Sequence, residues 1–100
     1  MTELARICEK HHVSELYLFG SVLTNQFNNK SDLDFLVKFG KVDPYEYFDN
    51  YSDLTSSLES LYSRKVDLVE VQTVKNPILK RTIERTKKII YGRENTEVFV

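Results

Sequence analysis

The sequence predicts a small α/β domain in which helices flank a short sheet. Apolar residues recur by turns at helical and at strand spacing, which gives the element order α-β-α-β-α-β-α. The 100 residues, 41% hydrophobic and 29% charged, suffice for one core and leave no room for a second. Strands that alternate with helices favour a sheet with helical cover. The pattern alone leaves the strand directions open.

The first half of the chain begins with an amphipathic helix. Leu4, Ile7 and Cys8 lie at helical spacing, and Thr2 can cap the helix N-terminus. Cys8 then falls on the apolar side, as a buried structural thiol does. The expected elements are a helix over residues 2–12, a strand over 15–19, a short helix or turn over 22–26, a polar loop over 28–31 and a strand over 32–39.

The second half is expected to hold a helix over 43–63, a strand over 65–71 and a helix over 76–90. Asp43 can cap the first of these helices, Pro44 suits its first position, and Glu46 completes a capping box. The side chains expected to be buried on this helix are Phe48, Tyr51, Leu54, Leu58, Leu61 and Tyr62.

The last helix is predicted to open at Asn76-Pro77 and to stop at Gly92. Its apolar stripe would comprise Leu79, Ile83, Thr86 and Ile90. We expect residues 1–92 to form the domain and residues 93–100 a C-terminal tail. The end of that tail, 98–100, could cover a sheet edge in a dimer or in a complex with a partner.

Composition narrows the classes of function. The formal charge is −1, and basic residues cluster only in the last predicted helix, which argues against a dedicated nucleic-acid binder. The sequence has no apolar run that could span a membrane and does not begin like a signal peptide. The single Cys8 cannot form an internal disulfide, which fits a cytoplasmic protein.

Asp32-Leu33-Asp34 is the most informative stretch for chemistry. Side chains at i and i+2 of a strand share a face, so the two carboxylates point together while Leu33 points toward the core. Neighbouring carboxylates repel each other unless a cation compensates, and Mg²⁺ binds through one or two carboxylates plus substrate phosphates. The alternative is a solvent-exposed pair on an edge strand with no ion.

Two further features support a phosphate and metal site. Gly20-Ser21 follows a strand directly, where backbone N–H groups and the hydroxyl can face an anion and glycine permits close approach. Asp67 interrupts the apolar strand that begins at Val66. An unpaired buried carboxylate is costly, so Asp67 is either exposed at the sheet or held near a cation.

The combination resembles the minimal nucleotidyltransferase (MNT) domain of the DNA polymerase β-like nucleotidyltransferase superfamily. Three segments carry the resemblance, namely residues 18–21 (LFGS), 31–37 (SDLDFLV) and 66–69 (VDLV). The family pattern is a Gly-Ser turn, an Asp-x-Asp strand shortly afterwards and a third Asp on a later strand. The resemblance spans roughly residues 4–92 and implies the small nucleotidyltransferase fold, with a short mixed sheet and flanking helices.

The resemblance also implies roles for the site residues. Asp32, Asp34 and Asp67 would be the catalytic residues and would hold two Mg²⁺ ions, with Mn²⁺ as a substitute. Gly20 and Ser21 would bind the phosphates of ATP. One departure is that many relatives carry arginines after Gly-Ser, whereas this chain has Val-Leu-Thr-Asn at 22–25.

Small MNT proteins resemble the antitoxins of HEPN–MNT toxin–antitoxin pairs. The resemblance therefore implies a protein adenylyltransferase that moves AMP from ATP to a tyrosine of a HEPN ribonuclease toxin. One alternative is an antitoxin that neutralises its partner by contact, with little or no catalysis. Another is transfer to a small molecule, as in aminoglycoside-modifying relatives, although those carry an additional substrate-binding domain.

Overall fold

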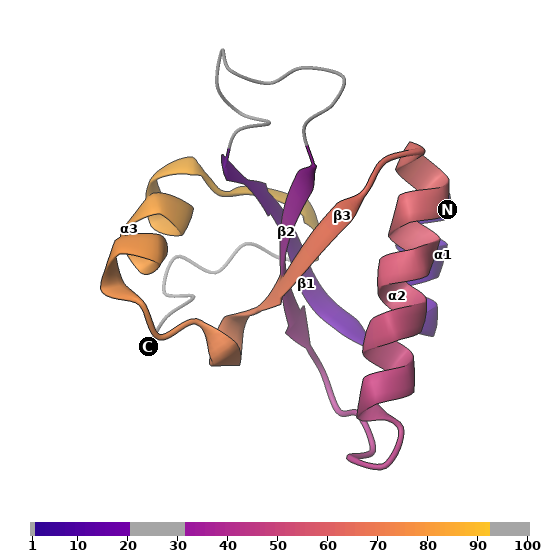
Figure 1. Ribbon diagram of the computed structural model, residues 1–100. Helices are drawn as coiled ribbons and strands as arrows, with labels where there is room; N and C mark the ends of the chain where they lie inside the picture. Colours follow the sequence, from indigo (N-terminus) through magenta and orange to yellow (C-terminus); the bar gives the residue numbers. More distant parts are fainter. Residues whose placement is uncertain (1, 21–31, 93–100) are drawn as a thin grey trace.

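The structure is a computed structural model that describes residues 2–20 and 32–92 (Figure 1). The elements in chain order are α1 Glu3–Lys10, β1 Val13–Phe19, β2 Leu33–Phe39, α2 Tyr47–Tyr62, β3 Val66–Glu70, the 3₁₀ turn η2 Val71–Thr73, α3 Pro77–Thr86 and β4 Lys88–Tyr91. The predicted helix or turn at 22–26, the loop at 28–31 and the tail at 93–100 lie outside the described residues.

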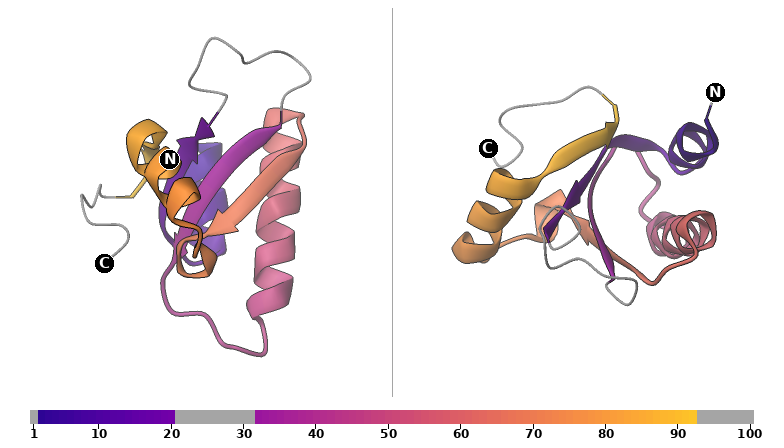
Figure 2. Two further views of the ribbon diagram at one scale, coloured as in Figure 1. Left: turned by 60° about the vertical axis from the view of Figure 1, so that its left-hand side comes forward. Right: turned by 90° about the horizontal axis from the view of Figure 1, so that it is seen from above.

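The strands of the described part form one mixed sheet in the order β3-β2-β1-β4. β2 runs parallel to β3, whereas β1 runs antiparallel to both of its neighbours, β2 and β4. Helices α1 and α2 cover one face of the sheet and α3 covers the other, as the view from above shows (Figure 2). The predicted fold class, a short mixed sheet with flanking helices, is confirmed.

Each face of the sheet has its own buried cluster. The cluster formed by the sheet with α1 and α2 comprises Cys8, Val13, Leu16, Leu33, Phe35, Val37, Leu54, Leu58, Val66 and Leu68. The cluster on the face that α3 covers comprises Tyr17, Phe19, Leu36, Val74 and Ile83. The alternation along β2 follows from the period of two in a strand, and it sends Leu33 to the first face and Leu36 to the second.

Two helix starts are confirmed at atomic detail. The Thr2 hydroxyl accepts a hydrogen bond from the Ala5 N–H, and the Asn76 side-chain oxygen accepts from the N–H groups of Ile78 and Leu79. Pro77 occupies the first position of α3, where its missing N–H would have had no helical partner. Cys8 is fully buried, as predicted, and burial raises the pKa of its thiol to about 12.

The predicted start of α2 is wrong by one turn. The Asp43 carboxylate does accept an N–H bond, from Tyr45, but residues 44–46 form a turn and the helix begins at Tyr47. Glu46 is the N-cap residue and makes no side-chain capping bond, so the predicted capping box does not form. Phe48, expected in the core, is 76% exposed. The inward stripe of α2 runs through Tyr51, Leu54 and Leu58, and at helical spacing its first member is Tyr47, which packs on Phe39.

The end of the predicted last helix is also wrong. α3 stops at Thr86, Lys87 adopts an extended ψ of 140°, and Lys88–Tyr91 pairs with β1 as strand β4. Ile90 therefore packs from a strand onto the cluster beneath α1 and α2, rather than from a helix. Gly92 is not a helix stop, since it follows β4 with φ +93° and a Cβ there would lie 2.3 Å from the Ser14 carbonyl oxygen.

Candidate active site

The register of β2 and β3 brings two of the predicted acidic residues side by side. Asp34 pairs with Asp67 in the parallel ladder, and directly paired residues project from the same face of a sheet. Their neighbours Leu33, Phe35 and Leu68 point to the opposite face, where they are buried beneath α1 and α2. The two carboxylates therefore share the face that α3 covers. Asp32 precedes β2 by one residue and is exposed.

Burial and the neighbouring carboxylates change the pKa of Asp34. Burial raises the pKa of the Asp34 carboxyl, and the negative charges of Asp67 and Asp32 raise that pKa further. Each of these effects disfavours the ionised form, so the folded chain holds negative charge here at an energetic disadvantage. A bound cation would remove that disadvantage.

Gly20 forms the other wall of the site. Phe19, the last residue of β1, pairs with Asp34 on β2, so Gly20 lies directly beside this carboxylate. Its φ is +81°, and a Cβ at this position would lie 2.7 Å from Asp34 Oδ2. Glycine is thus required twice, for its backbone conformation and for the space that the carboxylate occupies.

The N–H of Gly20 is already paired. It donates to Thr86 Oγ1 at 3.1 Å, and Thr86 lies at the end of α3. The sequence pattern predicts Thr86 on the buried stripe of a helix, and nothing in the sequence links it to Gly20, 66 positions away. Ser21, the other predicted phosphate ligand, lies outside the described residues.

The carboxylates on the face that α3 covers suit a hard cation, because carboxylate oxygens are the ligands that Mg²⁺ prefers. Asp34 and Asp67 are adjacent, and Asp32 is close enough to act on the Asp34 pKa. Within residues 2–20 and 32–92, no group of three or more His, Cys, Asp or Glu side chains is placed to hold a metal ion without further ligands. An open site of two or three carboxylates that is completed by a nucleotide fits this arrangement.

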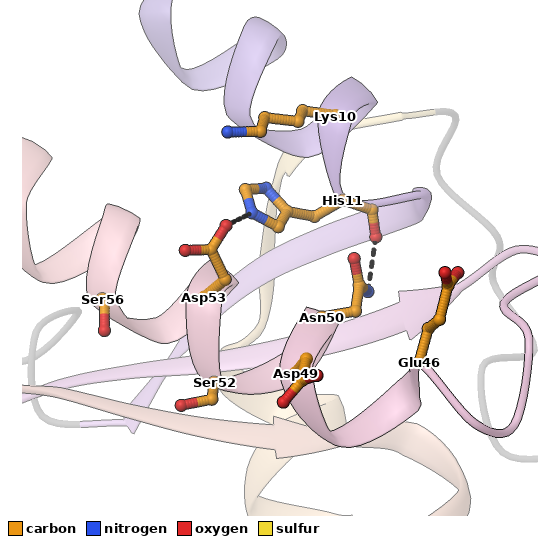
Figure 3. Close-up of a pocket in the computed structure, with 8 residues that line it drawn as sticks. All are labelled: Lys10, His11, Glu46, Asp49, Asn50, Ser52, Asp53 and Ser56. Atoms are coloured by element: carbon orange, nitrogen blue, oxygen red, sulfur yellow. Dashed lines mark hydrogen bonds and ion pairs between the residues drawn. The ribbon is translucent and has the colours of Figure 1, made fainter.

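A pocket of about 560 Å³ lies elsewhere, between the end of α1 and the start of α2 (Figure 3). His11 is its buried centre. The ring nitrogen Nε2 donates to the Asp53 carboxylate at 2.6 Å, and Asn50 donates to the His11 carbonyl oxygen at 2.8 Å. This pocket is on the side of the sheet that α1 and α2 cover, away from Asp34 and Asp67. Its bonds join the two helices, which explains these polar residues without a ligand.

Residues 2–96 match the polymerase beta nucleotidyltransferase family. MJ0128 of Methanocaldococcus jannaschii, whose provisional name is protein adenylyltransferase, is 40% identical over 76 residues, which cover 76% of this chain and 74% of that protein. A solved structure provisionally described as a minimal nucleotidyltransferase is 28% identical, has a TM-score of 0.67, and aligns over 83% of this chain and 81% of its own.

The fold is also shared with a chain from a complex of a tri-AMPylated Shewanella oneidensis HEPN toxin with an MNT antitoxin. That chain is 20% identical with a TM-score of 0.61, and the alignment covers 91% of this chain and 68% of that one. Among the described residues, no helix has the length and apolar character to cross a membrane.

Proposed function

Because the chain belongs to the polymerase beta nucleotidyltransferase family, we propose that it transfers AMP from ATP to a tyrosine of a HEPN-family toxin protein. The observation that carries this proposal is the pairing of Asp34 with Asp67 on one face of the sheet, beside a glycine whose position leaves no room for a side chain. We take residues 1–92 as the catalytic domain and the cytoplasm as its place of action.

The proposed roles of the site residues are metal binding and nucleotide binding. Asp32 and Asp34, with Asp67, form the acidic wall that would hold Mg²⁺ or Mn²⁺ and thereby orient the triphosphate. Gly20 would shape the nucleotide site, because its missing side chain lets the Asp34 carboxylate lie beside its backbone, and Ser21 would donate its hydroxyl to the phosphates. Bound divalent ions would supply charge stabilisation at the attacking and leaving oxygens.

Asp67 suits a second role at the acceptor. It is exposed, and its strand β3 is an edge strand of the described sheet, so a tyrosine from another protein can approach from that side. The tyrosine oxygen would form a bond to the α-phosphorus of ATP while the bond from that phosphorus to the bridging oxygen breaks and pyrophosphate leaves. Asp67 would take the hydroxyl proton.

The toxin partner is supported by two likenesses. The provisional name of MJ0128 concerns transfer of an adenylyl group to protein, and the S. oneidensis complex contains an AMPylated HEPN toxin beside an MNT antitoxin. A competing candidate is neutralisation by contact alone. Residues 22–25 favour it, because they lack the arginines with which many relatives would neutralise a triphosphate.

Incubation of the purified chain with ATP, Mg²⁺ and the HEPN protein of the same genome tests the proposal. Intact-mass spectrometry is expected to show a gain of one or more AMP groups on the HEPN protein, and peptide mapping is expected to place them on tyrosine. The gain should disappear with EDTA and with Asp34→Asn or Asp67→Asn.

Neutralisation by contact predicts a different result in cells. If the double variant Asp32→Ala/Asp34→Ala protects a host from the toxin at the same expression level as the wild-type chain, catalysis is not required. Absence of any mass gain with Mg²⁺ or Mn²⁺ would likewise exclude the transferase. A mass gain on serine or threonine in place of tyrosine would retain the chemistry and correct the acceptor.

A further inference from the structure

The hydroxyl of Thr86 makes two hydrogen bonds that fix its orientation. It donates to the Thr82 carbonyl oxygen, one turn earlier in α3, at 2.8 Å, and it accepts from the Gly20 N–H at 3.1 Å. A hydroxyl has a single hydrogen to give. Because the helix carbonyl takes that hydrogen, a lone pair of the oxygen is left facing the glycine N–H.

Gly20 is the point where this contact meets the site. Its Cα lies so close to Asp34 that an added Cβ would be 2.7 Å from the carboxylate oxygen, and its φ is +81°. A change of a few tenths of an ångström in the Gly20 peptide would alter the space beside Asp34. The bond from Thr86 holds that peptide at its N–H.

The helix that carries Thr86 is itself fixed to the sheet. Ile83, one turn before Thr86, is fully buried in the cluster with Phe19 and Leu36. These two residues flank the site, since Phe19 precedes Gly20 and Leu36 lies two positions beyond Asp34. A continuous set of contacts therefore runs from the buried face of α3 through the Thr86 hydroxyl to Gly20 and Asp34.

We infer that Thr86 is a positioning residue for the nucleotide, which acts by fixing the Gly20 peptide against the acidic wall. The inference rests on the proposed function. The Gly20 N–H donates to Thr86 in the structure, so on this inference Gly20 contributes to nucleotide binding through the space and shape of the site.

The test compares variants of α3 that differ in one contact. Thr86→Val and Thr86→Ala remove the hydroxyl, whereas Thr86→Ser retains it. Thr82→Val is the matched control, because the Thr82 hydroxyl makes the same kind of bond, to the Ile78 carbonyl oxygen at 3.1 Å, and is not among the contacts of Gly20. All variants are checked first by circular dichroism and thermal unfolding.

Hydrogen exchange of the Gly20 amide, followed by NMR, measures the contact without any nucleotide. Exchange should be slow in the wild-type chain, Thr86→Ser and Thr82→Val, and at least about tenfold faster in Thr86→Val and Thr86→Ala, since an unpaired N–H exchanges without local opening. Equal exchange in all five proteins would overturn the inference at its structural step, whether or not the chain is an enzyme.

Calorimetric titration with Mg²⁺ and a non-hydrolysable ATP analogue then measures the positioning. Loss of the bond is expected to weaken binding about tenfold in Thr86→Val and Thr86→Ala, with Thr86→Ser and Thr82→Val within about twofold of wild type. In AMP transfer the loss should appear mainly in KM for ATP.

The outcomes separate the two proposals. Wild-type affinity in Thr86→Val and Thr86→Ala, or an equal loss in Thr82→Val, overturns the positioning role. Unfolding of both Thr86→Val and Thr86→Ala also overturns it, because the hydroxyl would then serve the fold. Failure of the wild-type chain itself to bind the nucleotide removes the proposed function and the positioning role together, whereas the amide exchange still decides whether the contact between Thr86 and Gly20 forms.

Discussion

At the scale of single residues, the candidate site brings negatively charged carboxylates together at a cost to the stability of the folded chain. Asp34 is partly buried beside two further carboxylates, and both circumstances raise its pKa. A neutral side chain of the same shape would serve the folded state better. Residues that weaken the fold in this way are expected at functional positions.

Asp34→Asn is therefore expected to stabilise the chain in the absence of ligand. In EDTA at pH 7 the variant should melt at a higher temperature than wild type, by about 1–4 °C, because solvent screening limits the relief of repulsion to about 0.5 kcal/mol or less. Excess Mg²⁺ and ATP should reverse the order, since only the wild-type chain gains the stabilisation of a bound ligand. A lower Tm for Asp34→Asn in EDTA would contradict this account of the carboxylate.

His11 and Asp53 form a hydrogen-bonded pair that links the end of α1 to α2. Nδ1 of the His11 ring bonds the Ile7 carbonyl oxygen at 2.7 Å, while Nε2 bonds Asp53 at 2.6 Å. The hydrogen bond from His11 lowers the Asp53 pKa, and the charges of His11 and Lys10 lower it further.

The Asp53 pair predicts a pH dependence of stability on the acid side. A carboxyl whose pKa is lower in the folded than in the unfolded chain contributes stability above its unfolded pKa, and loses it as the pH falls through the folded value. The free energy of unfolding of wild type minus that of Asp53→Asn should therefore be largest above about pH 4 and should shrink by roughly half or more toward about pH 2.5.

Urea titrations at closely spaced pH values measure this difference, with Asp49→Asn, an exposed carboxylate on the same helix, as the control. A difference that stays constant across the acid range would show that Asp53 contributes through packing and not through its charge.

At the scale of elements, the edge strand β3 is protected by side chains. Its outward groups are met by the neighbouring helix and turn: Glu59 accepts from the Val66 N–H at 3.0 Å, the Tyr51 hydroxyl donates to the Leu68 carbonyl oxygen, and the Thr73 hydroxyl donates to that of Glu70. An open strand edge invites pairing with other chains. These bonds close part of the edge while Asp67, between Val66 and Leu68, stays exposed.

Loss of the Glu59 bond should weaken this protection. Glu59→Ala leaves the Val66 N–H without its partner and is expected to cost about 1–2 kcal/mol, because the acceptor is a carboxylate. Chemical denaturation measures the loss, and light scattering at high concentration should show increased association. Ser60→Ala, an exposed neighbour on α2, should change neither quantity. Unchanged stability in Glu59→Ala would mean that water replaces the carboxylate at no cost.

The elements also show where sequence patterns suffice. The motif predicts that Asp34 and Asp67 lie on neighbouring strands, but the sequence leaves the strand directions and the register open, so the direct pairing of these two residues comes from the structure. The sequence does not predict the boundary at Thr86, because Ile83 and Ile90 lie seven positions apart and so fit one helical stripe. In the structure residues 88–91 pair with β1 as a strand, which the spacing of the apolar residues does not indicate. The link from Thr86 to Gly20 depends on that boundary and so could not be predicted.

At the scale of the whole molecule, one face of the sheet serves mainly as the apolar core, whereas the other also carries the candidate active site. The face beneath α1 and α2 is an apolar core whose helices are also joined by the His11 bonds. The face beneath α3 has a smaller cluster, and it is the face that Asp34 and Asp67 share. Packing of α3 therefore has a consequence for the site that packing of α2 does not have.

Two core truncations of comparable size test this division. Ile83 and Leu58 are both fully buried, one in each cluster. Ile83→Ala and Leu58→Ala are each expected to cost about 2–5 kcal/mol, within the roughly 5–15 kcal/mol typical of a small domain. At a temperature where both variants are folded, Ile83→Ala should weaken binding of Mg²⁺ and an ATP analogue several-fold, because α3 no longer holds Thr86 firmly against Gly20. Leu58→Ala should bind within about twofold of wild type. If Ile83→Ala and Leu58→Ala lose affinity equally, loosening either face of the sheet would affect the site. The specific role assigned to the packing of α3 would then be wrong.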